Sequence, residues 1–177
     1  MPTPDAPADR WERERRKLAH QALFIIRLLL ILVGTSPWWI PLARAYLPIG
    51  PVGTILDGVF IVVCHRFPSR TIELAGQLMP VCSRCAGIFS GLAIGAALAW
   101  PRVEIRWARW ALVAAGAIML ADVITQDAGI HPPWHASRLI TGGLLGWAAS
   151  SALIAAIMRE RRMVRTRPES GWKTPHG

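Results

Sequence analysis

The stretch "CSRCAGIFSGLAIGAALAW", residues 82–100, places two cysteines directly ahead of a run of small and apolar residues. A chemically versatile Cys-x-x-Cys pair therefore stands at the start of a segment that is apolar enough to enter a membrane. Within the run, Gly87, Gly91 and Gly95 recur every four residues. Glycines at that spacing let two helix backbones approach closely, so we expect this segment to pack against another helix.

The composition indicates a membrane protein with one domain. The chain has 177 residues, 53% of them apolar, and a formal net charge of +9. Basic stretches at residues 10–17, 101–110 and 159–168 directly flank apolar segments. Such flanks orient membrane proteins and attract anionic lipid headgroups, so nucleic-acid binding is not needed to explain the charge. We expect the lipid bilayer as the partner, with anionic headgroups at the basic flanks and no nucleic acid.

Five apolar stretches compete for the membrane crossings, at residues 18–34, 52–64, 86–100, 110–126 and 139–158. A helix needs roughly 20 residues to cross the hydrocarbon, with about 17 as the lower limit. The stretch at 52–64 is short. If it is re-entrant, both termini and the linker at 102–109 lie on the inner side together with most of the lysines and arginines, as the positive-inside rule favours.

These considerations predict an all-α, polytopic transmembrane helical bundle with four full crossings and one short or re-entrant helix. Residues 1–17 are expected to form a basic cytoplasmic segment, residues 18–158 the transmembrane domain, and residues 159–177 a basic cytoplasmic tail. The expected location is the inner (cytoplasmic) membrane of the cell, with both termini cytoplasmic. The sequence leaves open whether the chain forms a homo-oligomer and whether it has a quinone as a partner.

All three cysteines fall near one predicted end of the bundle, on its outer side. Cys64 is followed by His65, and Cys82 and Cys85 come after a connection that Pro68 keeps from being one helix. Three thiols and one imidazole are four ligands, the number that a closed tetrahedral zinc site uses. The sequence thus predicts a metal site of three cysteines and one histidine near the outer membrane face, with zinc as the expected cofactor.

Two other readings use the same residues. At a helix N-terminus, Cys82 and Cys85 are suited to thiol–disulfide exchange, with Cys64 as a third thiol that resolves or relays the disulfide. The outer side is also a compartment in which a disulfide can persist. In the third reading the protein is a non-catalytic membrane scaffold or assembly factor whose cysteines only pack. The sequence leaves open whether the protein is an enzyme, and it assigns no catalytic residue.

Polar residues within or beside the apolar stretches are expected to support this site. Asp122 and Gln126 share a helix face, and a carboxylate inside a membrane segment is a functional candidate by default. We expect Asp122 to pair with Arg138 at the start of the next crossing, and Arg84 to lower the pKa of the flanking cysteines. The complete supporting set is Arg70, Arg84, Asp122, Thr125, Gln126 and Arg138.

Three stretches follow a known family pattern in its order: "CHRFPSRTIELAGQLMPVCSRCAGIFSG" (64–91), "ADVITQDAG" (121–129) and "RLITGGLLG" (138–146). In these stretches the chain resembles the small prokaryotic integral membrane proteins of the domain-of-unknown-function family numbered 2085. The chain departs from the family's pattern at Thr71, where serine is usual, and at Phe89, where tyrosine is usual. The resemblance implies a membrane protein and supports the proposed site, but it implies no reaction.

Overall fold

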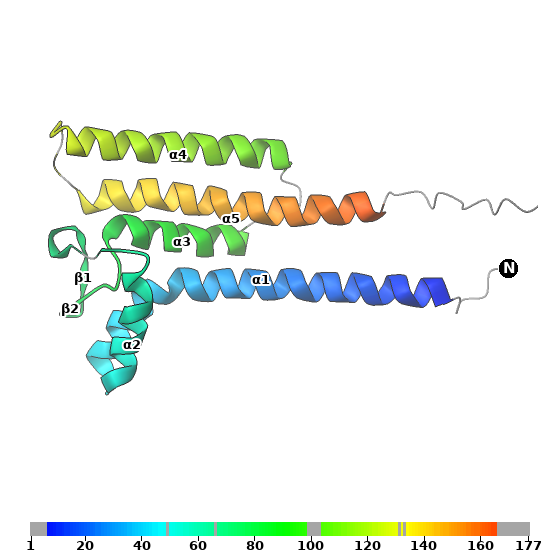
Figure 1. Ribbon diagram of the computed structural model, residues 1–177, viewed down its shortest axis with the longest axis horizontal. Helices are drawn as coiled ribbons and strands as arrows, with labels where there is room; N and C mark the ends of the chain where they lie inside the picture. The colour runs from blue at the N-terminus through cyan, green and yellow to red at the C-terminus, as the bar shows by residue number, and fades with distance from the viewer. Residues whose placement is uncertain are drawn as a thin grey trace, which may run out of the picture.

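A computed structural model of the protein describes residues 7–48, 50–65, 67–98, 104–130, 132 and 134–165. These residues are mostly helical, as the sequence predicts, with one small hairpin (Figure 1). The elements, in chain order, are α1 (Pro7–Tyr46), α2 (Gly50–Ile61), the 3-10 helix η1 (Pro68–Arg70), β1 (Glu73–Leu74), β2 (Gln77–Leu78), α3 (Ser83–Leu98), α4 (Ile105–Asp127) and α5 (His135–Arg165).

Four of the helices run side by side in the order α4, α5, α3, α1 (Figure 1). The short helix α3 lies between α5 and α1 and packs most extensively against α5. The helix α2 projects away from the end of α1, and the hairpin covers the same end of the bundle. The start of α3, the end of α4 and the start of α5 also meet at this end. The elements that carry the unusual polar residues and the cysteines therefore gather at one end of the bundle.

Among the described residues, three helices are long and apolar enough to cross a membrane: Arg13–Tyr46 within α1, Ile105–Asp127, and His135–Arg159 within α5. The helix α3 has 16 residues, which is a length of about 24 Å at the usual rise and falls short of the roughly 30 Å of hydrocarbon. Four full crossings are therefore not confirmed. The stretch expected to be short is the 12-residue helix α2.

The helix α1 is longer than the apolar stretch that predicted it. It begins at Pro7, continues through Pro37 and Pro41, both buried, and ends at Tyr46. This part of α1 is joined to α3 by a hydrogen bond of 2.7 Å, which Trp38 Nε1 donates to Ser90 Oγ. The helix α5 likewise runs past residue 158 to Arg165. The predicted terminal segments are thus partly helical, while their residues 1–6 and 166–177 lie outside the described part of the chain.

Backbone-to-backbone contact joins α3 to α5. A Cβ added at Gly91 would lie 2.7 Å from the backbone nitrogen of Trp147, and one at Gly146 would lie 2.9 Å from that of Leu92. Neither distance is compatible with a real side chain. Gly87 and Gly142 meet the opposing backbone in the same way. The glycines spaced four apart therefore act as predicted, by letting two helices touch through their main chains.

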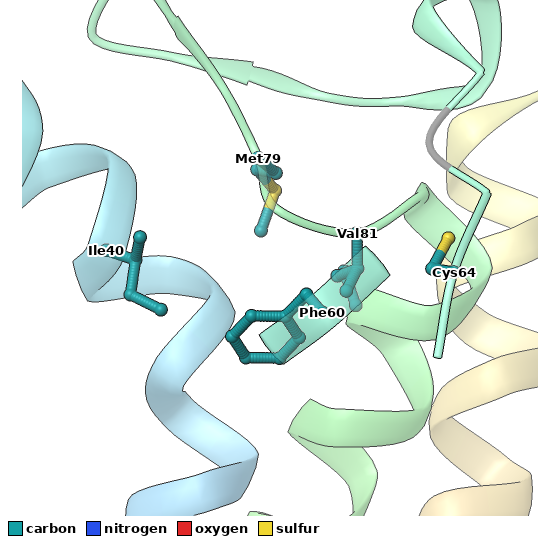
Figure 2. Close-up of a cluster of buried hydrophobic side chains, with 6 residues drawn as sticks. Ile40, Phe60, Cys64, Met79 and Val81 are labelled. Carbon is teal, nitrogen blue, oxygen red and sulfur yellow. The ribbon is translucent and has the colours of Figure 1, made fainter. Parts of the chain in front are cut away.

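A cluster of buried hydrophobic side chains lies at the end of the bundle where α1, α2, the hairpin and α3 meet (Figure 2). Phe60 packs edge-to-face on Phe89, with ring centroids 5.6 Å apart, an arrangement that favours the ring quadrupoles. The cluster consists of Ile40, Phe60, Cys64, Met79, Val81 and Ala86. Because Cys64 is a member, the same packing that fixes the end of α2 also fixes one of the predicted site residues.

Substitution of Gly91 by alanine is expected to destabilise the fold by about 2 kcal/mol, because its methyl group has no space against the α5 backbone. Gly116→Ala in α4 is the matched control, since a Cβ there meets nothing within 4 Å. The measurement is reversible unfolding of the detergent-solubilised variants. Equal stability of the two variants would contradict a close α3–α5 contact.

Candidate metal-binding site

A folded connection returns the chain from Cys64 to Cys82. In its second half, β1 and β2 pair antiparallel, with Glu73 opposite Leu78 and Leu74 opposite Gln77. The two turn residues, Ala75 and Gly76, both have positive φ values, 53° and 74°. That conformation suits the twist of a two-residue hairpin turn. The hairpin reverses the chain within a few residues and directs it to the start of α3.

The first half of the connection is held by the turn η1. The Arg70 N–H donates to the Phe67 carbonyl at 2.9 Å, and Thr71 Oγ1 donates to the same carbonyl, also at 2.9 Å. Ser83 Oγ donates to the Arg70 carbonyl at 3.2 Å. This last bond ties the turn to the first residue of α3, which lies between Cys82 and Cys85.

The structure brings the three predicted thiols together. The Sγ atoms of Cys64, Cys82 and Cys85 all lie within 4.8 Å of one another, and all three cysteines are free. The Cys82 backbone N–H donates a hydrogen bond of 3.2 Å to Cys64 Sγ, across 18 positions of sequence. Cys64 is buried and the other two are half-buried. Two separate segments of the chain therefore offer three soft ligands to one point.

The predicted fourth ligand, His65, is placed differently from the thiols. It directly follows Cys64, but its side chain is exposed and its nitrogens do not join the group of three sulfurs. The arrangement seen is thus a group of three cysteines with a histidine beside it. Three thiols are sufficient to hold a thiophilic metal ion when another donor completes the coordination.

Mutual hydrogen bonding perturbs the thiols. The Cys85 side chain donates to Cys82 Sγ, and this bond is the main cause that lowers the pKa of Cys82 to about 5, against the opposing effect of burial. Cys64 and the backbone N–H groups of Cys85 and Arg84 lower it further. Cys82 therefore ionises more readily than Cys85. The sequence predicts that Arg84 lowers the pKa of both flanking cysteines. Its backbone N–H contributes to this for Cys82, but its guanidinium pairs with Asp122, and the prediction is wrong for Cys85, whose pKa is raised by its bond to the Cys82 thiol and by burial.

The guanidinium of Arg84 forms an ion pair with the buried carboxylate of Asp122, with 2.6 Å between Nη2 and Oδ2. Gln126 donates from Nε2 to Asp122 Oδ1 at 3.1 Å. It also accepts a bond of 2.8 Å from Arg138 Nε. The sequence predicts Arg138 as the partner of Asp122. The structure adds Arg84 as an ion-pair partner of this carboxylate and links Arg138 to it through Gln126, one turn further along α4.

The remaining supporting residues are more peripheral. Thr125 Oγ1 donates to the Ala121 carbonyl of its own helix at 2.8 Å. Arg70 is exposed, with its guanidinium carbon 5.8 Å from the Phe67 ring centroid. Sequence reasoning missed Thr141, whose Oγ1 lies 3.5 Å from Asp122 Oδ2. Its position three residues after Arg138, on the same helix face, was the available signal.

Comparisons with known proteins agree on the region that holds this site. The chain is 30% identical over 101 residues to the uncharacterized protein MJ1492 of Methanocaldococcus jannaschii, covering 54% of this chain and 64% of that protein. It is 53% identical over 32 residues to an uncharacterized protein of Methanothermobacter thermautotrophicus, covering 18% of this chain and 29% of that protein. The chain thus spans less than two thirds of either relative. No solved structure matches it.

The family model of the predicted membrane proteins called DUF2085 matches residues 64–152, about half of the chain. The match begins at the first of the three thiols and includes α3, α4 and the part of α5 that contacts them. The family is therefore defined by the same segment that gathers the cysteines and the buried ion pair. The chain belongs to this family of membrane proteins, DUF2085.

Proposed function

We propose that this membrane protein binds one zinc ion through Cys64, Cys82 and Cys85. The observation that supports this is the separation of the three Sγ atoms, all within 4.8 Å of one another. Zinc–sulfur bonds of about 2.3 Å in tetrahedral geometry would set two sulfurs about 3.8 Å apart. Only a small contraction is therefore needed. Zinc suits a set of thiolate ligands, and a closed set of four donors gives it a structural role.

His65 is the proposed fourth ligand. It is adjacent to Cys64 and exposed, so a change in its side-chain rotamer costs no buried packing. The ion would then join the end of the α2 segment to the first turn of α3, across the connection that contains η1 and the hairpin. In this role the metal stabilises the end of the bundle in the way that a disulfide stabilises a secreted domain.

The membrane arrangement belongs to the same proposal. The helix α3, which lies between α5 and α1, would be the fourth and shortest membrane helix. The helix α2 would lie at the membrane boundary. Both termini would be cytoplasmic in the inner membrane, with basic flanks at anionic headgroups. The metal site would then lie near the outer face. Basic residues on α1, α4 and α5, at the bundle end opposite the hairpin, support this orientation.

Protein purified without chelators is expected to contain about one zinc ion per chain. The double variant Cys82→Ser, Cys85→Ser is expected to lose the metal, because serine hydroxyls are poor ligands for zinc. Elemental analysis of gel-filtered protein, combined with a thiol count, makes the measurement. A natively folded wild-type chain without metal would defeat the proposal.

Replacement of His65 by alanine is expected to raise the zinc dissociation constant roughly tenfold or more, by removing one donor. His135→Ala is the matched control, because this histidine is also exposed but starts α5. Competition with a chromophoric chelator measures both. If His65→Ala binds zinc as tightly as His135→Ala does, the fourth donor is not His65 and the site is a three-thiol site.

A second candidate function, thiol–disulfide exchange, is favoured by the low pKa of Cys82 and by the two thiols beside it. The Cys82 thiolate would attack a disulfide of a partner protein and form a mixed disulfide, releasing one partner thiolate. Cys85 would then displace the second partner sulfur, so that the partner disulfide is reduced and a Cys82–Cys85 disulfide forms with loss of one proton. The two electrons pass from the cysteine pair to the partner.

This candidate predicts that Cys82 in metal-free protein reacts with iodoacetamide at pH 6. Its pKa lies at about 5, well below the 9.0 of an unperturbed thiol, so the thiolate persists as the pH falls until about 5. Mass spectrometry after timed alkylation between pH 4 and 9 gives the profile for each cysteine. A profile for Cys82 centred near pH 9 would rule out an activated thiol. If the cysteine variants lower only the stability, and change neither the zinc content nor the alkylation profile, the protein is a scaffold.

A further inference from the structure

The buried polar network beside the thiols carries more positive than negative charge. Arg138 is 3% exposed and Asp122 is 8% exposed, while the side chain of Arg84 is 17% exposed. Of the charged side chains described in this network, two are therefore guanidiniums and one is a carboxylate. Gln126, which accepts the bond from Arg138 Nε, is neutral. A net charge of this kind is costly away from water unless another group compensates it.

Among the described residues, the Cys82 thiol can supply negative charge close enough to act on Arg138. Arg138 interacts electrostatically with Cys82 as well as with Asp122, Arg84 and Arg70. Its neighbour Leu139 packs against the buried cluster that also includes Cys82 and Cys85 at its edge. The first turn of α5 is thus held against the first turn of α3. Among the described residues, the acidic side chains of β1 and of the end of α4, Glu73 and Asp127, are exposed, where solvent screens them.

Three thiolates around a divalent ion carry a net charge of −1, and a neutral imidazole leaves that count unchanged. We infer that Arg138 is the counter-charge of the metal–thiolate centre, and that neutral Gln126 keeps that charge available by orienting the guanidinium without neutralising it. The inference rests on the proposed metal site. It makes Arg138 a positioning residue that acts through charge and touches no metal.

The test compares zinc affinities of the full-length protein and four variants by chelator competition in detergent. Arg138→Gln, which removes the charge, is expected to raise the zinc dissociation constant roughly 10- to 100-fold. Arg138→Lys retains the charge and is expected to stay within about threefold of wild type, as is Arg109→Gln, whose arginine is exposed near the start of α4, at the other end of the bundle. Zinc-free unfolding of each variant reports the purely structural contribution.

The variant Gln126→Glu separates charge from shape. It is nearly isosteric and gives Arg138 and Arg84 a charged acceptor, but it also removes the Nε2 donor to Asp122 Oδ1, so its structural cost is measured separately as a loss of zinc-free stability. A counter-charge role predicts a zinc dissociation constant raised roughly tenfold or more beyond that structural cost, because the new carboxylate neutralises Arg138. This variant also decides the matter if Arg138→Gln does not fold.

The inference is overturned if Gln126→Glu binds zinc with wild-type affinity, or if Arg138→Lys is as impaired as Arg138→Gln. A wild-type protein that binds no zinc defeats the proposed function itself, and so is a different outcome. Wild-type binding with unaffected variants leaves the metal site in place and removes only the role of Arg138.

Discussion

The main-chain contact between α3 and α5 sets the position of everything at the site end of the bundle. At Gly91 and Gly146 the two backbones lie so close together that a Cβ atom at either position would collide with the opposing main chain. With helices this close, the first turn of α3 can occupy only one depth along α5. Arg84 then reaches Asp122 on α4, past the start of α5, and the two cysteines that flank Arg84 face the end of α2. Packing by small residues thus determines where the polar chemistry lies.

The buried ion pair follows from the same constraint. A charged side chain in an apolar environment must find a partner or pull in water. Arg84 satisfies this need with Asp122, and the amide of Gln126 links that pair to Arg138. Since Arg84 stands between Cys82 and Cys85, any rotation of the first turn of α3 would disturb both the ion pair and the thiols. The thiols and the ion pair therefore move together with the first turn of α3, although their chemistry differs.

The sequence predicted the elements whose signals are local or periodic. The Cys-x-x-Cys spacing predicted that Cys82 and Cys85 share a site, and the glycine repeat predicted a close contact of residues 86–100 with another helix, because each signal lies in residues that are close together in the chain. The structure identifies that other helix as α5. The extent of α1 was harder to predict, since Pro37 and Pro41 normally end a helix and are tolerated here inside a buried contact. The hairpin was not predicted because each strand has two residues and its turn places alanine at a positive φ. The ion pair of Asp122 with Arg84 depended on side-chain reach between helices, which no spacing reports.

The number of thiols bears on which chemistry the arrangement suits. A disulfide between any two of them would leave the third sulfur beside it, within 4.8 Å and without a partner of its own kind. A metal ion would use all three at once, and the Cys82 N–H, which donates to Cys64 Sγ, would stabilise the coordinated thiolate. The metal–thiolate centre would also give the excess positive charge of the Arg84, Asp122 and Arg138 network an opposite charge. A neutral disulfide that includes Cys82 would leave that charge uncompensated, so Arg84 and Arg138 favour a metal over such a disulfide on electrostatic grounds.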